Sequence, residues 1–139
     1  RNFTSKLLLS EIQKINEVEV EPNIILLGDF NEDPDDNNVL LLESAGLTNL
    51  MMAMIDKEDI STYIYRGTNY LYDQIIVSNS ILDEKGFTLA DSNAYILDLP
   101  KYRQQKGKYK NYPFRFWAGN KLLGGYSDHL AVKVDFVIK

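Results

Sequence analysis

The spacing of apolar residues near the start of the chain is that of a helix. The apolar set comprises Phe3, Leu7, Leu8, Ile12, Ile15 and Val18, with polar residues between them. This stripe predicts an amphipathic helix over residues 4 to 19, with Thr4 or Ser5 available as its N-cap. Pro22 and Asn23 mark the end of this helix.

The rest of the chain shows the shorter apolar runs and alternations that are typical of strands. The unbroken run over residues 24–27 predicts a strand buried on both faces, and residues 39–45 predict a second helix that stops at Gly46. Residues 61–66 and 71–78 indicate two strands joined by a hairpin-type connection at residues 67–69. Residues 87–89, 94–97 and 131–139 indicate further strands, the last one half-exposed. Two helices among about six strands predict an α/β or α+β sandwich whose helices cover a sheet.

Size and composition favour a single globular unit over residues 1–139. Hydrophobic residues make up 45% of the chain and charged residues 25%, and we find no internal repeat or linker. No apolar stretch approaches the roughly 18 residues that span a bilayer, so no membrane span is expected. The absence of cysteine excludes disulfides and thiolate zinc sites, which leaves oxygen ligands and one imidazole for any metal.

Charge is distributed unevenly along the chain. The net charge of −5 by itself disfavours a polyanionic partner. Residues 99–127, however, contain no acidic residue and seven cations, interleaved with aromatic residues; the cations are Lys101, Arg103, Lys106, Lys108, Lys110, Arg115 and Lys121. This mixture suits phosphate contact and base stacking, and Arg115, Trp117 and Lys121 are our candidate substrate-binding residues. The alternative is a solvated loop whose aromatic residues reach into the core.

A polar motif follows the first predicted strand. Asp29 and Asn31 lie two residues apart at a strand end, where ligands commonly gather in α/β sheets. Asp29 can accept a proton or bind a hard cation, and Asn31 can donate to a phosphate oxygen. A turn stabilised by the same side chains is the alternative. A calcium loop is excluded because Pro34 and Leu40 replace its glycine and bidentate glutamate.

Asp73 and His129 are two further candidate catalytic residues. Asp73 lies in a strand-like run, where a carboxylate needs a partner or a place at the rim of the sheet. His129 is the only histidine and follows Ser127 and Asp128 after a pair of glycines, so any titration near neutral pH depends on it. An edge-strand aspartate and a structural histidine are the alternatives. A nucleophilic triad using Ser127 is disfavoured because the nucleophile-elbow pattern is missing.

Taken in order, the segments 28–31, 71–78 and 127–129 resemble the endonuclease/exonuclease/phosphatase superfamily, the metal-dependent phosphoesterases related to deoxyribonuclease I. The residues 65–67 and 124–126 are similar to a bacterial branch of it. The resemblance spans about residues 2 to 138 and corresponds to the C-terminal half of the family's domain. It implies half of a four-layer α/β/β/α sandwich.

The resemblance also implies roles for the site residues. Asp73 and His129 would form a hydrogen-bonded pair, Asp29 would orient or deprotonate the attacking water, and Asn31 would hold the developing oxyanion. Asp128 would help to bind Mg²⁺ or Mn²⁺ together with a glutamate for which this chain has no matching motif. Gln74 stands where many relatives carry histidine, which weakens a substrate assignment more than the activity.

We therefore expect a Mg²⁺-dependent hydrolase of phosphate esters, endonuclease-like, that needs the missing N-terminal half of its domain and is inactive as this fragment alone. The substrate is a nucleic acid, or else a phosphorylated small molecule or lipid. The competing hypothesis from a different class is a non-catalytic or degenerate binding module. The resemblance and the lack of cysteine point to an exported bacterial protein.

Overall fold

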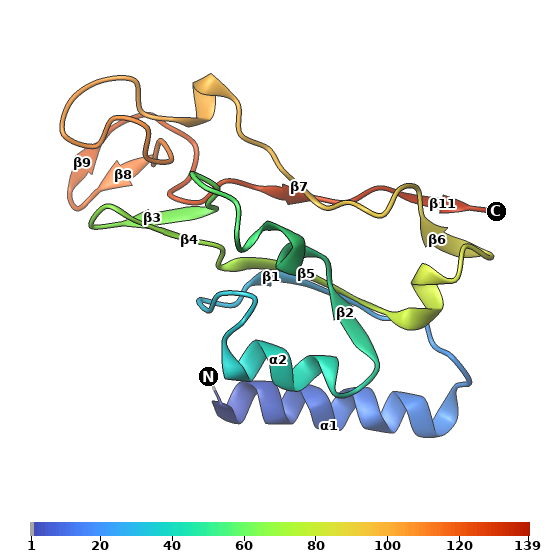
Figure 1. The fold of residues 1–139 in the computed structure, drawn as a ribbon. Coiled ribbons are helices and arrows are strands. Elements are labelled where there is room, and N and C mark those ends of the chain that lie inside the picture. Colours follow the sequence, from blue (N-terminus) through green and yellow to red (C-terminus); the bar gives the residue numbers. More distant parts are fainter. Residues whose placement is uncertain (1) are drawn as a thin grey trace.

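The computed structural model describes residues 2–139, and its elements form layers (Figure 1). Helices α1 (Asn2–Val18) and α2 (Asn37–Glu43) lie side by side along one face of a three-stranded sheet. The sheet has the order β1 (Ile25–Asp29), β5 (Asp73–Ser78), β2 (Leu47–Asn49), and all its pairings are antiparallel. Short strand pairs cover part of its other face.

Both predicted helices are present, with shifted boundaries. Helix α1 includes Thr4 and Ser5 within its first turns, so the predicted N-cap at these residues is wrong. Its apolar stripe is only partly covered, because Ile12 is buried against α2 and the sheet while Phe3 and Val18 are exposed. Helix α2 begins two residues before the predicted start and ends at Glu43. Among the described residues, no helix is long and apolar enough to cross a membrane.

The central strand β5 separates two hydrophobic clusters. Its alternation sends Ile76 toward the helices and Ile75 and Val77 toward the opposite side, and all three are fully buried. Strand β1 differs, since Leu27 remains 63% exposed although the sequence predicts burial on both faces. That prediction is wrong because β1 is the last strand of the described sheet, and the strand pairs on the far side pack over β5.

The second cluster lies between β5 and the strands that cross it. Strand β6 (Phe87–Leu89) pairs with β11 (Phe136–Ile138), and β7 (Tyr95–Ile96) pairs with β10 (Val132–Lys133). The predicted strand over 131–139 is therefore two shorter strands. Three short 3-10 helices, Leu50–Met54, Asn79–Leu82 and Pro100–Tyr102, complete the layer and its connections.

Two hairpins project beyond the end of the sheet where β1 stops and β5 starts (Figure 1). Strand β3 (Tyr63–Tyr65) pairs with β4 (Thr68–Tyr70), and β8 (Trp117–Ala118) pairs with β9 (Lys121–Leu122). The predicted pairing of residues 61–66 with 71–78 is wrong, because β3 pairs with β4 in the hairpin and β5 pairs with β1 in the central sheet. The mixed α/β class with antiparallel sheets is confirmed, and the four-layer sandwich stays a prediction.

Candidate functional site

Two carboxylates face each other across the central pair of strands. Asp29 ends β1 and Asp73 begins β5, and the register places them directly opposite one another. Both belong to the alternation that points away from the helices, with Leu27 and Ile75 as the next pair on the same face. Like charges in this arrangement are unfavourable unless a cation or hydrogen-bond donors lie between them.

His129 supplies that group. Its backbone forms a bridge with Tyr63, and the N–H of Leu130 donates to Thr62 O at 2.8 Å, so the segment after the double glycine runs beside the first hairpin. The ring nitrogen Nδ1 lies 2.7 Å from Asp73 Oδ2, and Nε2 lies 4.0 Å from Asp29 Oδ2. The imidazole therefore lies between two carboxylates that come from different strands.

This environment raises the pKa of His129 above its ordinary value of 6.5. The main cause is the hydrogen bond with Asp73, partial burial opposes it, and the charges of Asp73, Asp29 and Asp128 add to it. With Nδ1–H donated to Asp73, the second nitrogen Nε2 is left to contact a bound group. A protonated Nε2 can donate a hydrogen bond to an anionic oxygen.

Two neighbours that sequence reasoning missed hold this pair in place. The ring of Tyr63 stacks on the imidazole, with centroids 4.6 Å apart and an interplanar angle of 25°. Thr62 is fully buried, and its Oγ1 accepts a hydrogen bond from the N–H of Asp73 at 3.2 Å. Both residues lay in a predicted strand, and nothing in their spacing marks them as neighbours of a residue far along the chain.

Asp29 and Asn31 form a local turn at the end of β1. The N–H of Asn31 donates to Asp29 Oδ1 at 2.8 Å, and Asn31 Nδ2 donates to Asp29 Oδ2 at 3.1 Å. Asn31 has a φ of 53°, a left-handed conformation that asparagine tolerates better than most residues. The turn interpretation and the site interpretation coincide, because the carboxylate that Asn31 contacts in the turn also faces His129.

Buried hydrogen bonds fasten the loop after this turn. Gln74 is fully buried; its Nε2 donates to Glu32 O at 2.9 Å and to Leu71 O, and its Oε1 accepts from Asn49 Nδ2 at 3.0 Å. Asp33 accepts from the N–H of Leu71, and burial is the main reason that the pKa of Asp33 is raised. Among the described residues, the side chain of Gln74 thus has a structural role: its hydrogen bonds hold the loop against β5.

The serine and aspartate before His129 have different contacts. Ser127 Oγ accepts from the backbone N–H of His129 at 3.0 Å, which is a turn contact, while the two ring nitrogens face Asp73 and Asp29. Asp128 Oδ2 lies 3.5 Å from Arg115 Nη2, and both side chains are partly exposed. The nucleophilic triad is therefore not formed by the described side chains.

A close approach of two backbones brings Arg115 to this position. A Cβ on Gly125 would lie 2.1 Å from Phe114 O, and the N–H of Tyr126 donates to that same oxygen at 2.6 Å. Only glycine allows this contact. Within the basic segment, residues 99–127, it holds the residue before Arg115 against the two residues that lead toward Asp128 and His129.

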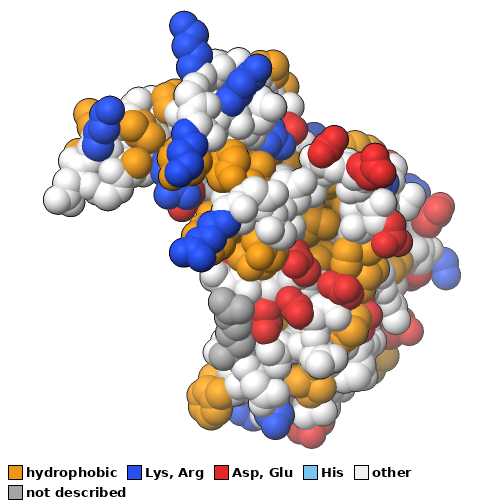
Figure 2. Space-filling model, turned by 60° about the vertical axis from the view of Figure 1, so that its left-hand side comes forward, with side chains coloured by type: hydrophobic (Ala, Val, Ile, Leu, Met, Phe, Trp, Pro, Cys, Tyr) orange, Lys and Arg blue, Asp and Glu red, His pale blue; other side chains and the backbone are white. Residues whose placement is uncertain are grey.

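The two remaining candidate residues lie on the β8–β9 hairpin. Trp117 and Lys121 are exposed there, and the Trp117 ring contacts Phe116 with a centroid distance of 5.8 Å. Figure 2 shows several Lys and Arg side chains gathered at the upper left of one face, with most of the Asp and Glu side chains to the right of them and below. The structure thus brings Asp29, Asn31, Asp73 and His129 together, places Arg115 and Asp128 beside them, and leaves Trp117 and Lys121 on the projecting hairpin.

The described residues do not by themselves form the Mg²⁺ or Mn²⁺ site that the resemblance implies. Within residues 2–139 there is no group of three or more His, Asp or Glu side chains placed to hold a metal ion. Asp128, the predicted ligand, is instead paired with Arg115.

Comparison with known proteins identifies one relationship. A family model described as Endonuclease/Exonuclease/phosphatase family matches residues 1–138. Searches of curated proteins and of solved structures find no match. The match covers all three motifs that carry the resemblance in the sequence.

Proposed function

This chain belongs to the endonuclease/exonuclease/phosphatase family, and we propose that it carries the His129 part of the active site of a phosphate-ester hydrolase. The observation that carries this proposal is the position of His129 between Asp73 and Asp29. An imidazole whose one nitrogen is fixed by a carboxylate is oriented to use its other nitrogen on a substrate.

Each residue has a chemical task in this proposal. Asp73 orients the ring and stabilises its charged form, and His129 Nε2 donates to an oxygen of the scissile phosphate. Asp29 accepts from the attacking water, and the carboxamide of Asn31, which already contacts Asp29, donates to the developing oxyanion. Water gives a proton to Asp29 and its oxygen bonds to phosphorus, the phosphorus–ester oxygen bond breaks, and the leaving oxygen takes up a proton from solvent. A phosphodiester thus yields a phosphomonoester and an alcohol.

Hydrolases of this family generally depend on a divalent metal ion. The chain as described supplies too few ligands, so we propose that Asp128 contributes one oxygen and that a glutamate outside these 139 residues contributes another. The requirement is checked by chelation, which is expected to abolish hydrolysis by the intact protein.

The exposed side of β1 supports the need for an additional segment. Strand β1 is at the edge of the described sheet, and Ile25 and Leu27 are exposed on the same face as Asp29. An apolar strand edge beside a polar site is a surface that proteins normally cover. We propose that the missing half of the domain covers this edge and completes the metal site.

The basic segment favours a nucleic acid over other phosphate esters. One of its cations, Arg115, lies beside the site through its pairing with Asp128, and its aromatic side chains offer stacking surfaces. Steep loss of DNA binding with added salt would support this substrate. Salt-insensitive hydrolysis of a phosphorylated small molecule or lipid would support the alternative, a phosphatase.

The proposal is tested by hydrolysis of a phosphodiester by the intact protein in the presence of Mg²⁺. His129→Ala and Asp29→Ala are each expected to abolish activity, whereas Asp135→Asn, which removes an ion-paired carboxylate outside the site, leaves it unchanged. Near-normal rates in either alanine variant would overturn the assignment. Metal binding and hydrolysis both absent from the intact protein would instead support the binding-module hypothesis.

A further inference from the structure

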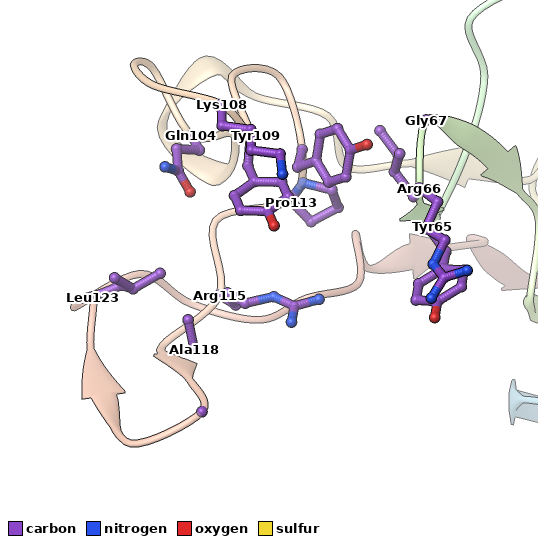
Figure 3. Close-up of a pocket in the computed structure, with 13 residues that line it drawn as sticks. Tyr65, Arg66, Gly67, Gln104, Lys108, Tyr109, Pro113, Arg115, Ala118 and Leu123 are labelled. Carbon is purple, nitrogen blue, oxygen red and sulfur yellow. The ribbon is translucent and has the colours of Figure 1, made fainter.

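A cavity of about 660 Å³ lies between the β3–β4 turn and the basic segment (Figure 3). No acidic side chain lines it among the described residues. Its charged and aromatic lining consists of three cations and three tyrosines: Arg66, Lys108, Arg115, Tyr65, Tyr109 and Tyr112. The volume is within the range of small-molecule sites and is too small for a duplex. The cavity is therefore suited to one anionic group that carries a ring.

Each of two opposite walls of the cavity presents a cation beside an aromatic ring. The Arg66 guanidinium lies 5.2 Å from the centroid of the Tyr65 ring, and Lys108 Nζ lies 5.6 Å from that of Tyr109. The two pairs come from segments far apart in the sequence, and Figure 3 shows them on different sides of the space into which Arg115 extends. Stacking surfaces and phosphate-binding groups are thus available together.

Two sets of side-chain contacts connect residues that line the cavity with the candidate site, and His129 itself does not line the cavity. Tyr65 stacks on Tyr63 with centroids 6.5 Å apart, and Tyr63 stacks on the imidazole of His129. On the other side, Arg115 lines the cavity and also pairs with Asp128, the residue before His129. A ligand in the cavity would therefore lie next to a phosphate held at His129.

The turn that carries Arg66 has an unusual residue at its first central position. Arg66 has a φ of 50° and Gly67 a φ of 88°, which makes a two-residue turn with both central residues left-handed. Asparagine and glycine are the ordinary residues at such positions, and a larger side chain there is disfavoured. A charge is therefore kept at the mouth of the cavity in spite of the local backbone preference.

We propose that this cavity holds one unstacked nucleotide of a single-stranded nucleic acid, next to the phosphate that His129 contacts. This inference rests on the proposed function and adds the form of the substrate. A base removed from its stack needs an aromatic surface, and its phosphates need cations, whereas a duplex is contacted through its grooves and backbone. A phosphorylated inositol headgroup would use the cations but has no aromatic ring to place against the tyrosines.

The test is fluorescence anisotropy with a labelled octathymidylate single strand, in a chelator that prevents hydrolysis. Arg66→Asn, which removes the charge and suits the left-handed turn, and Tyr109→Leu, at an exposed ring, are each expected to weaken binding about tenfold or more. Lys133→Gln is the matched control, because Lys133 also lies near a tyrosine ring, at 6.0 Å from Tyr95, outside this cavity. A duplex of the same length, formed with octa-adenylate, is expected to bind at least tenfold more weakly than the single strand.

Three outcomes would overturn the inference: unchanged binding in both cavity variants, equal affinity for the duplex, or no binding of the single strand by a protein that binds inositol trisphosphate. The two proposals fail separately. If His129→Ala abolishes hydrolysis while the cavity variants bind normally, the nucleotide cavity is wrong and the hydrolase stands. If the intact protein hydrolyses no phosphodiester but the cavity variants lose binding, the hydrolase is wrong and the nucleotide cavity stands.

Discussion

Asp29 and Asp73 lie directly opposite one another on antiparallel strands, and the imidazole of His129 lies between their carboxylates. The register of β1 against β5 creates this relationship, so a shift of one residue would turn one carboxylate toward the helices. The chemistry proposed for the site therefore depends on the same pairing that builds the central sheet.

The pKa of His129 is expected to fall when Asp73 is changed to asparagine. Asp73 is the largest cause of the raised pKa, both through its hydrogen bond and through its charge, and Asp29 has a smaller effect. Because the chain has one histidine, its ring-proton NMR signals can be followed through a pH titration without assignment ambiguity.

We expect the titration midpoint of the unmodified protein to lie above 6.5, with Asp73→Asn lowering it more than Asp29→Asn does. Asp135→Asn serves as the control for loss of a carboxylate elsewhere. A midpoint that is the same in Asp73→Asn and in the unmodified protein would show that the pair does not form in solution.

The stability of the protein is expected to decrease as the pH rises above 6.5. The pKa of His129 is higher in the folded protein than in the unfolded chain, so the folded state binds more protons between the two values. The stabilising contribution is complete below the unfolded pKa and is lost as the pH passes the folded pKa. Urea unfolding between pH 5.5 and pH 9 measures it, and His129→Gln is expected to flatten the curve in that range.

Gln74→Ala is expected to destabilise the fold by about 2 to 4 kcal/mol. The substitution leaves the carbonyls of Glu32 and Leu71 and the amide of Asn49 without their buried partner, and it opens space in the sheet. Urea unfolding measures the loss. The control is Gln105→Ala, at an exposed glutamine in the basic segment, which is expected to change the free energy of unfolding by less than about 0.5 kcal/mol. Equal losses in the two variants would contradict the structural role assigned to the buried hydrogen bonds of Gln74.

Two substitutions at Asn31 separate its chemistry from its backbone conformation. Asn31→Gly removes the carboxamide but adopts the left-handed φ without strain, while Asn31→Ala adds a backbone cost of about 1 kcal/mol. We expect both to lower kcat by about 10²- to 10³-fold, as loss of an oxyanion donor does, and only the alanine variant to lose stability. A glycine variant with normal kcat would assign Asn31 to the turn alone.

Local sequence patterns are sufficient to predict part of the fold and part of the candidate site. The apolar run before Gly28 and the polar residues after it predict a strand end that carries Asp29 and Asn31, and the structure places them there. The exposure of Leu27 could not be foreseen, because it depends on which strands pack over β1. The strand pairing of residues 71–78 was wrong for a similar reason: alternation shows that a strand exists and not which strand it joins.

The contact between Asp73 and His129 was anticipated through the family resemblance and not through spacing. The two residues are 56 positions apart, and no periodicity links them. Contacts between residues far apart in the sequence also create the surroundings of Thr62 and Tyr63 and the cavity beside Arg66, so the sequence does not predict them. These features arise only when the hairpin, the basic segment and the strand entrance meet in space.

The central claim is that Asp73 acts on the reaction through His129, and a double-mutant cycle in kcat/KM for a phosphodiester tests it most directly. His129→Gln alone is expected to lower kcat/KM by about 100-fold or more, and Asp73→Asn to lower it substantially in the presence of His129. In the His129→Gln background, we predict that adding Asp73→Asn changes kcat/KM by less than about twofold. Losses that multiply in the double variant would show that the two residues act independently and would contradict the account.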